Sequence, residues 1–316
     1  MKYVINNCTD AHWNMAHDEF LLEGLSGDAV FCLWQNAPAV IIGLNQSAYA
    51  EVNLPYLEEH GIKLARRVTG GGAVYHDLGN LNYSIAGPAR EVEKYYDLMA
   101  DALCRLGLPA ERTGRNDIMV DGLKCSGWAK RLSKDRMMIH GTLMWDVDME
   151  ALTEALAVPG SKLSAAGIAS VRSRVCNLRS LLPQFKTLEE FRDALHGILA
   201  DGSPEIHLTY TQKAEITHQT QQKFATWEWI YGRSPKTEFK STKKFPCGTI
   251  TAHYTLTHGV FSELDFTGDF IGNRPAQELA ARLIGHKQED ILKESVGDYF
   301  DNLQAAELLR FIMKLN

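Results

Sequence analysis

The sequence predicts an α+β protein in two parts: a large domain with a mixed or antiparallel sheet and flanking helices, and a small α/β domain at the C-terminus. Short apolar runs separated by turn residues fill the first half of the chain, as is typical of strands. Helical patterns interrupt these runs without regular alternation, which favours α+β over a doubly wound parallel sheet. A polar segment at residues 232–246 then separates a final hairpin pattern from the rest of the chain.

The strand candidates begin at residue 30. Residues 30–34 and 39–44 are apolar runs, and the four residues between them have turn composition. Asp121 and Gly122 form a hairpin signal between two later runs. The remaining strand candidates of the first half are residues 63–67, 73–76, 81–86, 118–120, the run from residue 123 onward, and 137–145.

The helix candidates of the first part have apolar residues at intervals of three and four. Asp148 is placed to cap one of them, and Thr187 with Glu190 forms a capping-box pattern ahead of another. These helix candidates are residues 14–23, 92–106, 149–156 and 191–199.

The chain after the polar segment has the pattern of a separate small domain. Residues 248–256 and 260–266 are a predicted hairpin, and three helical stretches follow. Asn273 and Pro275 suit the start of the first stretch, and Gly285 suits its end. The expected division is a main, catalytic domain over residues 1–238 and an accessory domain over residues 245–316.

Composition and charge exclude several classes of protein. The chain has 316 residues, 45% of them hydrophobic and 23% charged, with a formal net charge of −6. This balance provides no general basic field, so we expect no nucleic-acid partner. We expect no membrane span, because no apolar run approaches the roughly 18 residues that one needs. Residues 1–10 lack the apolar centre of a secretory signal, and the six cysteines form no C-x-x-C pair, so we expect a cytoplasmic protein with reduced thiols.

The strongest chemical signal is the stretch from Arg66 to Asp77, RRVTGGGAVYHD. Three consecutive glycines between two strand candidates permit positive φ and a close approach of a ligand to the backbone. The two arginines in front supply forked, permanently charged donors for phosphate or carboxylate. No G-x-x-x-x-G-K-[ST] occurs, and Tyr75 takes the third-glycine position of a dinucleotide fingerprint. An anion site and a flexible hairpin tip are both open, and the arginines favour the anion site.

Lys124 follows the predicted turn and precedes Cys125, Ser126 and Gly127. A lysine on a strand beside a close-approach glycine could neutralise a phosphate as a point charge. A solvated hairpin lysine is the alternative, and spacing alone favours it. Cys125 could accept an acyl group as a nucleophile. A lone cysteine in a strand is more often a small buried hydrophobe, which is the interpretation we favour.

Five segments resemble, in order and spacing, the signatures of the lipoate–protein ligase family, within the biotin and lipoate ligase superfamily. They are RRVTGGGAVYHDLGN at 66–80, GRND at 114–117, GLKCSGWA at 122–129, MIHGTL at 138–143 and GIASVRSRVCNL at 167–178. The chain after Phe245 resembles the small C-terminal domain of this family. The resemblance covers nearly the whole chain, and it implies a catalytic domain of the biotin/lipoate ligase type.

The resemblance implies roles for individual residues. Lys124 matches the lysine that bridges the lipoate carboxylate and the α-phosphate, and Lys124 with Arg67 would be catalytic. Trp34 matches an aromatic residue that lines the pocket for the lipoyl tail. The implied nucleotide-binding residues are Arg67, Gly72, Ala73, Val74, Tyr75, Asn116, Asp117 and Lys124. The implied lipoate-binding residues are Trp34, Gly71, His76, Lys124, His140 and Gly141. The implied loop over the adenylate contains Ser170, Val171, Arg172 and Arg174.

Some residues keep two interpretations. Val40, Ile42 and Val74 are either further walls of the tail pocket or plain sheet core. Asp77 and Asp117 are either ligands of Mg²⁺ or residues of turns and helix caps.

Two residues depart from the family pattern, which often has a small or polar residue in place of Trp128 and an aliphatic one in place of Cys125. Trp128 either narrows the pocket or packs behind its strand. Neither change removes a charged group, so we expect any effect to fall on the choice of acyl chain.

The resemblance implies an enzyme that uses ATP and Mg²⁺ to convert lipoic acid into lipoyl-AMP. The lipoyl group would then pass to a lysine of apo lipoyl domains, in 2-oxoacid dehydrogenase E2 subunits and in the glycine cleavage H protein. One alternative is an ATP-independent octanoyl or lipoyl transferase that uses Cys125 or Cys176. Another is a lipoate- or nucleotide-binding protein without turnover. The paired arginines and Lys124 favour the ligase.

Overall fold

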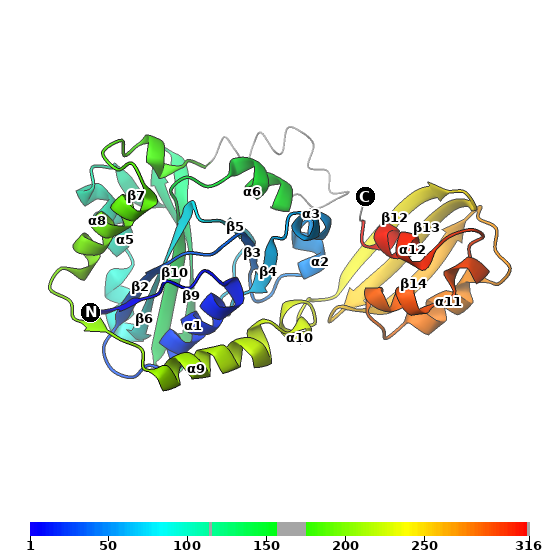
Figure 1. Ribbon diagram of the computed structural model, residues 1–316, viewed down its shortest axis with the longest axis horizontal. Helices are drawn as coiled ribbons and strands as arrows, with labels where there is room; N and C mark the ends of the chain where they lie inside the picture. The colour runs from blue at the N-terminus through cyan, green and yellow to red at the C-terminus, as the bar shows by residue number, and fades with distance from the viewer. Residues whose placement is uncertain (114–115, 157–174, 315–316) are drawn as a thin grey trace.

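The computed structural model describes residues 1–113, 116–156 and 175–314. Figure 1 shows a large body that contains the N-terminus and, at the other end of the molecule, a small sheet with its own helices. The expected loop with Ser170, Val171, Arg172 and Arg174 lies outside the described residues. The α+β class predicted from the sequence is confirmed.

The large body is built on an eight-stranded mixed sheet with the order β11-β1-β2-β6-β10-β9-β8-β7. Strand β1 runs parallel to both of its neighbours, and the pairs from β2 to β7 across the sheet are antiparallel. The strands are β1 (Lys2–Ile5), β2 (Val30–Trp34), β6 (Asn80–Pro88), β7 (Ala110–Thr113), β8 (Asp117–Val120), β9 (Leu123–Ser133), β10 (Arg136–Met144) and β11 (Glu205–Ile206).

A second, three-stranded sheet has the order β4-β3-β5 and shares its hydrophobic cluster with one face of the large sheet. Its strands are β3 (Ala39–Ile42), β4 (Lys63–Arg66) and β5 (Val74–His76). Because β4 and β5 lie on opposite sides of β3, the chain between them must cross the end of β3. The glycine run makes this crossing, at the edge where the two sheets meet.

Helices cover both faces of the large sheet. Helix α1 (Ala11–Glu23) packs on the face that also carries the small sheet, and α5 (Leu98–Arg105) and α8 (Leu188–Ala200) contribute to the cluster on the opposite face. Helix α6 (Met149–Leu156) is capped by Asp148, as the sequence predicts. The other helical segments of this body are α2 (Ala48–Glu51), α3 (Leu54–Glu59), α4 (Ala89–Val92), η1 (Glu93–Tyr95) and η2 (Leu178–Ser180).

The single helix predicted over residues 92–106 is wrong, because the chain forms α4, η1 and α5 in its place. Tyr96 leaves the helical pattern and its ring packs against that of Trp128 in a tilted arrangement, with 5.6 Å between centroids. Burial of this aromatic pair against the sheet outweighs the continuation of one helix, whose intrinsic stabilisation per residue is small.

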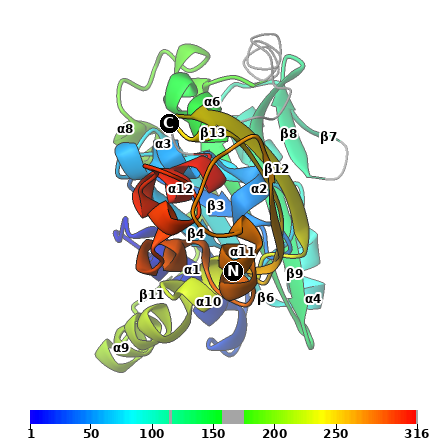
Figure 2. The ribbon, with the colours of Figure 1, turned by 90° about the vertical axis from the view of Figure 1, so that its right-hand side faces the viewer.

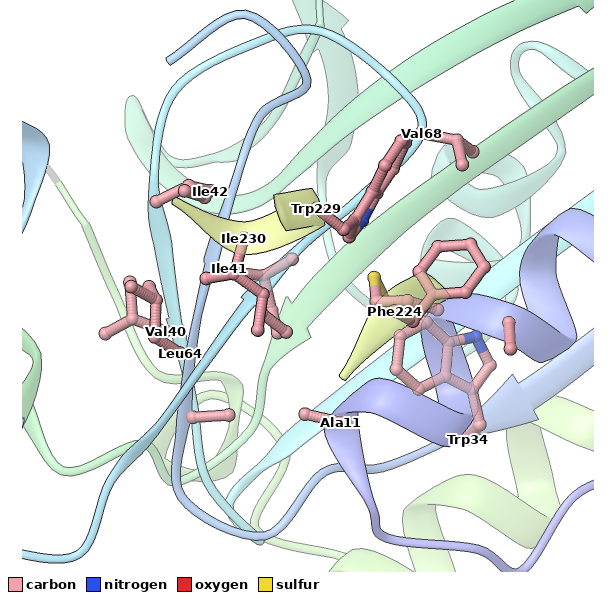
Figure 3. Packing of buried hydrophobic residues seen from close by; sticks show 14 of the residues in the cluster. Ala11, Trp34, Val40, Ile41, Ile42, Leu64, Val68, Phe224, Trp229 and Ile230 are labelled. Atoms are coloured by element: carbon pink, nitrogen blue, oxygen red, sulfur yellow. The ribbon is translucent and has the colours of Figure 1, made fainter. Parts of the chain in front are cut away.

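The connection to the C-terminal part runs along one edge of the large body as α9 (Tyr210–Gln219), the π-helical turn η3 (Thr220–Phe224) and α10 (Trp227–Ile230). Phe224 and Trp229 insert into the first hydrophobic cluster, together with Trp34 of β2 and Ile41 of β3. Figure 3 shows part of this cluster, where side chains from the connection, the small sheet and the large sheet lie together.

The C-terminal part has a three-stranded antiparallel sheet covered on one side by helices, and a hydrophobic cluster of its own (Figure 2). The predicted hairpin is confirmed as β13 (Gly248–Thr257) and β14 (Val260–Gly268). The predicted helical stretches are α11 (Ala276–Leu283), two 3₁₀ turns at η4 (Gln288–Lys293) and η5 (Val296–Asp298), and α12 (Ala305–Ile312).

The polar segment at residues 232–246 is mostly a strand, β12 (Thr237–Phe245), and not a linker. It pairs with β13 on one side only. Its exposed lysines suit an edge strand, because charged side chains discourage pairing with other chains, while Ser241 and Phe245 turn inward. Within the described part of the chain, no helix combines the length and apolar character that a bilayer crossing requires.

Candidate functional site

The glycine loop between β4 and β5 packs against another glycine. Gly71 has a φ of +98°, which favours glycine. A Cβ built on Gly43 would lie 2.1 Å from the carbonyl oxygen of Gly71, so the two backbones approach more closely than any side chain permits. The loop is therefore a tightly held crossing rather than a flexible hairpin tip.

The side chain of Arg67 holds this loop from inside. Its guanidinium donates to the carbonyl oxygens of Gly70 (Nη2, 2.7 Å), Gly72 (Nη2, 2.8 Å) and Ile41 (Nη1, 3.0 Å). Its Nε also donates to Thr69 Oγ1 at 3.0 Å. Burial lowers the pKa of Arg67 to about 10, so the group stays charged at neutral pH. A fixed positive charge thus lies directly behind the loop backbone.

Arg66 points the other way, because successive residues of a strand face opposite sides. It is fully buried and ties β4 to the connection, so the expectation that both arginines serve one anion site is wrong for Arg66. Its guanidinium donates to the carbonyl oxygens of Gly43, Leu44, Gln46, Trp229 and Ile230 and to Ser234 Oγ.

A cavity of about 150 Å³ opens beside the glycine loop, between the small sheet and the large one. It brings together most of the residues singled out in the sequence. Those that line it are Trp34, Arg67, Gly71, Gly72, Ala73, Val74, His76, Asn116, Lys124, His140 and Gly141. Tyr75 is buried in β5 outside the lining, and Asp117 lies behind Lys124.

Lys124 stands at the polar end of the cavity, near the start of β9. Its Nζ lies 2.7 Å from Asp117 Oδ1, and both side chains are about one-third exposed, at 37% and 35%. A Cβ on Gly127 would lie 3.1 Å from that Nζ, so the glycine leaves the space that the lysine occupies. The alternative of a free hairpin lysine in open solvent does not describe this side chain.

The apolar wall of the cavity uses a different residue of β3 from the two candidates in the sequence, one position away from each. Ile41 and Met15 line the cavity, whereas Val40 and Ile42 do not and are plain core. Ile41 pairs with Val74 across β3 and β5, and both side chains line the cavity. A shift by one residue moves a side chain to the other face of a strand, and the apolar run 39–44 contains no signal of which face is which.

His76 forms part of the cavity wall and is neutral. Burial, followed by electrostatic interaction with Arg67 and His140, lowers its pKa to about 3. The amide of Asn36 lies 3.0 Å from His76 Nδ1, and the imidazole makes an edge contact with Trp34 at 6.2 Å between centroids. In the described part of the chain its buried Nε2 has no hydrogen-bond partner.

A buried polar chain that the sequence did not reveal runs behind the cavity. Trp34 Nε1 donates to Ser84 Oγ at 2.9 Å, and Ser84 Oγ donates to Asp18 Oδ1 at 2.6 Å. His140 Nδ1 lies 2.7 Å from Asp18 Oδ2, and its Nε2 lies 2.7 Å from Thr69 Oγ1. The available signal was an Asp within an apolar helical pattern, because a charged residue on a buried face needs partners.

The two candidate nucleophiles do not belong to the cavity lining. Cys125 is fully buried and burial raises the pKa of its thiol to about 12, while burial also raises the pKa of Cys176. Both thiols are therefore protonated at neutral pH, which disfavours nucleophilic attack. The prediction that Cys125 is a small buried hydrophobe is confirmed.

Trp128 packs behind β9. Its indole packs against the ring of Tyr96 and belongs to the second hydrophobic cluster, on the face of the sheet opposite to Trp34. It pairs across the strands with Gly141, whose missing side chain leaves room for the ring of Tyr83. Trp128 also contributes to the lining of the cavity. Both interpretations left open by the sequence therefore hold in part: the residue packs in the second cluster and borders the pocket.

Asp77 is a turn residue. Its carboxylate accepts hydrogen bonds from the backbone N–H groups of Gly79 (2.8 Å) and Asp148 (2.9 Å). Among the described residues, no group of three or more His, Cys, Asp or Glu side chains is arranged to hold a metal ion. Asp117 lies next to the cavity lining through its contact with Lys124 and is partly exposed.

Comparison with known proteins agrees with this geometry. The family model of the lipoyl protein ligase A/B catalytic domain matches residues 10–200, and that of the bacterial lipoate protein ligase C-terminus matches residues 234–312. The chain is 36% identical over 330 residues to the lipoate-protein ligase LplJ of Bacillus subtilis, an alignment that covers 99% of this chain and 100% of the relative. The chain therefore belongs to the lipoate–protein ligase family, and the resemblance found in the sequence is confirmed.

Two solved structures share the fold over about three quarters of this chain. A bipartite lipoate protein ligase from Thermoplasma acidophilum, studied with its E2 lipoyl domain, has a TM-score of 0.67 and 28% identity, covering 73% of this chain and 96% of that chain. A lipoate-protein ligase A bound with ATP has a TM-score of 0.65 and 27% identity, covering 73% of this chain and 98% of that chain.

Proposed function

We propose that this protein is an ATP-dependent lipoate–protein ligase, which converts lipoate into lipoyl-AMP and transfers the lipoyl group to a lysine of a lipoyl domain. The observation that carries the proposal is the cavity. It has an apolar wall from Met15, Trp34 and Ile41 at one part and the cations of Lys124 and Arg67 at another. Lipoate has a matching distribution of polarity: a long apolar tail, and a carboxylate that has to reach a phosphate of ATP.

The first step needs positive charge around the α-phosphate of ATP. Attack of the lipoate carboxylate on the α-phosphate of ATP forms a C–O–P mixed anhydride and releases pyrophosphate. Negative charge accumulates around the phosphorus, and preorganised cations lower the barrier because they require no rearrangement. Lys124, held by Asp117, would contact the carboxylate and the phosphate, and Arg67 would hold the loop that receives the nucleotide.

The nucleotide site would comprise Arg67, Gly72, Ala73, Val74, Tyr75, Asn116, Asp117 and Lys124. Mg²⁺ would supply further charge for the phosphates when bound. Asp117 is the residue that would hold it, since it is partly exposed beside the cavity, whereas the carboxylate of Asp77 is engaged in its turn. The role of Ser170, Val171, Arg172 and Arg174 over the adenylate stays a prediction.

In the second step a lysine amine of the acceptor attacks the acyl carbon, and AMP leaves. The amine must lose a proton. His140 lines the cavity, but both of its ring nitrogens are engaged, one by Asp18 and the other by Thr69. We therefore assign His140 to the wall of the acyl pocket, with Trp34, Gly71, His76 and Gly141, and not to proton transfer.

The proposed acceptors are apo lipoyl domains, both those of 2-oxoacid dehydrogenase E2 subunits and the glycine cleavage H protein, in the cytoplasm. The Thermoplasma ligase that shares the fold was studied with an E2 lipoyl domain, which supports the first class. We also propose that the expected main domain, residues 1–238, carries the chemistry and that the expected accessory domain, residues 245–316, also takes in β12, which pairs with β13; the two separate family matches support a two-part division.

The test is incubation of the protein with ATP, Mg²⁺, lipoate and an apo lipoyl domain, followed by intact mass spectrometry of the acceptor. We expect the acceptor to gain one lipoyl group, with release of pyrophosphate that requires lipoate. Acceptor acylation without ATP, from an octanoylated donor protein, would support the cysteine transferase instead. Binding of lipoate or ATP with no pyrophosphate release would reduce the protein to a binding protein.

A further inference from the structure

Arg67 and Asp18 are two buried ionisable groups beside the cavity. Arg67 is 7% exposed and contacts backbone oxygens and Thr69, with no carboxylate among its partners in residues 1–113, 116–156 and 175–314. Asp18 is 1% exposed, and across the same residues its direct ionisable partner is the ring of His140 rather than a lysine or an arginine. An isolated buried charge is strongly destabilising, so both groups require compensation.

We propose that Asp18 is a positioning residue that balances the charge of Arg67 through His140 and Thr69 and thereby fixes both ends of the cavity. The proposal rests on the proposed function, because the two ends are those assigned to the acyl tail and the nucleotide. Asp18 is not itself part of the cavity lining, so it acts through other residues.

The chemistry of the groups sets the direction of every hydrogen bond in the first branch. An ionised carboxylate only accepts, so His140 Nδ1–H donates to Asp18 Oδ2 at 2.7 Å. With its proton on Nδ1, the imidazole accepts at Nε2, and the hydroxyl of Thr69 donates to it at 2.7 Å. Arg67 Nε–H in turn donates to Thr69 Oγ1 at 3.0 Å. The guanidinium and the carboxylate are thus joined through the hydroxyl of Thr69 and the imidazole of His140, with every hydrogen bond donated in the direction of Asp18.

A second branch ends on the other oxygen of the same carboxylate. The indole N–H of Trp34 donates to Ser84 Oγ at 2.9 Å, and the Ser84 hydroxyl donates to Asp18 Oδ1 at 2.6 Å. Ser84 is fully buried, so its hydroxyl has no access to water as a substitute partner. One carboxylate therefore orients Trp34 at the acyl wall and, through His140 and Thr69, the arginine that holds the glycine loop.

Asparagine at position 18 would break this arrangement without changing its shape. An amide offers one accepting oxygen and one donating nitrogen, so only one of the two branches keeps its direction. If the amide nitrogen faces His140, the imidazole proton must move from Nδ1 to Nε2, and Thr69 loses its acceptor. Hydrogen bonds in such a chain strengthen one another, so one reversal weakens the whole branch.

The first experiment compares Asp18→Asn with Glu19→Gln, a matched neighbour on the same helix. Glu19 is also buried and pairs with Lys223 at 2.7 Å, away from the cavity lining. We expect Asp18→Asn to raise KM for lipoate and lower kcat for lipoyl-AMP formation by about tenfold each, the scale of one misplaced group in a preorganised site. Glu19→Gln should leave both constants within about twofold. Equal effects of the two substitutions, or unchanged constants in Asp18→Asn, would overturn the proposal.

Two further variants separate the branches and do not require the Asp18 variant to fold. Ser84→Ala cuts the branch to Trp34 and should raise KM for lipoate more than KM for ATP. Thr69→Val cuts the branch to Arg67 and should raise KM for ATP more than KM for lipoate. The opposite pattern, or equal shifts of both constants in each variant, would show that the chain does not connect the two ends as proposed.

A spectroscopic readout keeps this inference separate from the proposed function. The ring ¹⁵N shifts of His140, assigned by their loss in His140→Gln, report which nitrogen carries the proton. We expect the Nδ1–H tautomer in the wild-type protein and the Nε2–H tautomer in Asp18→Asn. The same tautomer in both, together with an unchanged KM for lipoate in Asp18→Asn, would overturn the proposal, because neither branch would then have been reversed. A wild-type protein that makes no lipoyl-AMP would refute the proposed function and leave this readout intact.

Discussion

The two faces of the large sheet are made by the same strands but carry different side chains, polar on one face and apolar on the other. On β6, Asn82 and Ser84 face the cavity side, whereas Leu81, Tyr83 and Ile85 belong to the second hydrophobic cluster. A strand with this alternation is normally solvated on its polar face. Here both polar residues are 1% exposed or less, because α1 and the small sheet cover that face.

The difference shows where the chemistry resides. On the cavity side, buried polar groups form a directed hydrogen-bond chain and are held by their partners. On the opposite side, aromatic rings such as Trp145 and Phe191 stack at 4.7 Å between centroids and contribute burial alone. Substitutions on the first face should therefore change catalysis more than stability, and substitutions on the second face should do the reverse.

The largest effect is expected at Lys124. Lys124→Ala removes the cation at the polar end of the cavity and should lower the rate of lipoyl-AMP formation by about a thousandfold, or about 4 kcal/mol, while the fold persists. Pyrophosphate release measures the rate. Lys130→Ala is the matched control on the same strand, because Lys130 contacts the ring and hydroxyl of Tyr96 outside the cavity lining. Wild-type turnover in Lys124→Ala would remove Lys124 from the mechanism.

The comparison of the faces is tested most directly by one aromatic residue on each. Phe191→Ala leaves a hole in the second cluster and should lower the free energy of unfolding by about 3 kcal/mol, with KM for lipoate unchanged. Trp34→Ala should instead weaken the binding of lipoate more than the binding of ATP, as measured by the two apparent affinities. Equal changes in both affinities for Trp34→Ala would make Trp34 a structural residue like Phe191.

A pH dependence of stability should arise on the cavity side. Burial lowers the pKa of His17 to about 4 and that of His76 to about 3, below the value near 6.5 in the unfolded chain. Stability from these groups is complete above pH 6.5 and falls as the pH drops towards 4 and 3, because only the unfolded chain takes up the protons. Each of the two histidines should lower the free energy of unfolding at pH 5 by about 2 kcal/mol relative to neutral pH.

Urea unfolding at pH 7.5 and pH 5 measures this loss, and His17→Phe provides the control. Phenylalanine keeps the stacking on Trp13, where the centroids are 5.3 Å apart, and cannot titrate. The loss between the two pH values should therefore shrink by about 2 kcal/mol in the variant. An identical loss in both proteins would mean that His17 is not the titrating group.

The smallest effect is expected on the opposite face at Cys125. Cys125→Ala removes one buried sulfur atom and should lower the free energy of unfolding by about 1 kcal/mol, with lipoyl transfer unchanged. Cys176→Ala should behave in the same way. Mass spectrometry of the acceptor domain checks both. Loss of transfer in a folded Cys125→Ala protein would revive the transferase with a covalent acyl intermediate.

Much of the architecture followed from local pattern. The α+β class, β2, α6, the C-terminal hairpin and the glycine crossing agree with the sequence because strand and helix periods, caps and turn residues act over a few positions. The errors have one origin. The helix over residues 92–106 is broken where Tyr96 packs against Trp128, and the polar segment at 232–246 becomes β12 by pairing with β13. Both depend on contacts between residues distant along the chain.

The sequence by itself determined the family, the glycine run with its arginines, and the lysine of the site, because these are combinations of residue types at short spacing. Only the tertiary structure decided which side of each strand meets the cavity. It separated Arg67 from Arg66, selected Ile41 over its neighbours, and packed Trp128 into the second hydrophobic cluster. It also joined Asp18, from a helix near the N-terminus, to His140. Which side chains face the cavity depends on the elements that cover each face of the sheet. Side chains alternate between the two faces of a strand, so the local pattern alone does not say which set will line the cavity.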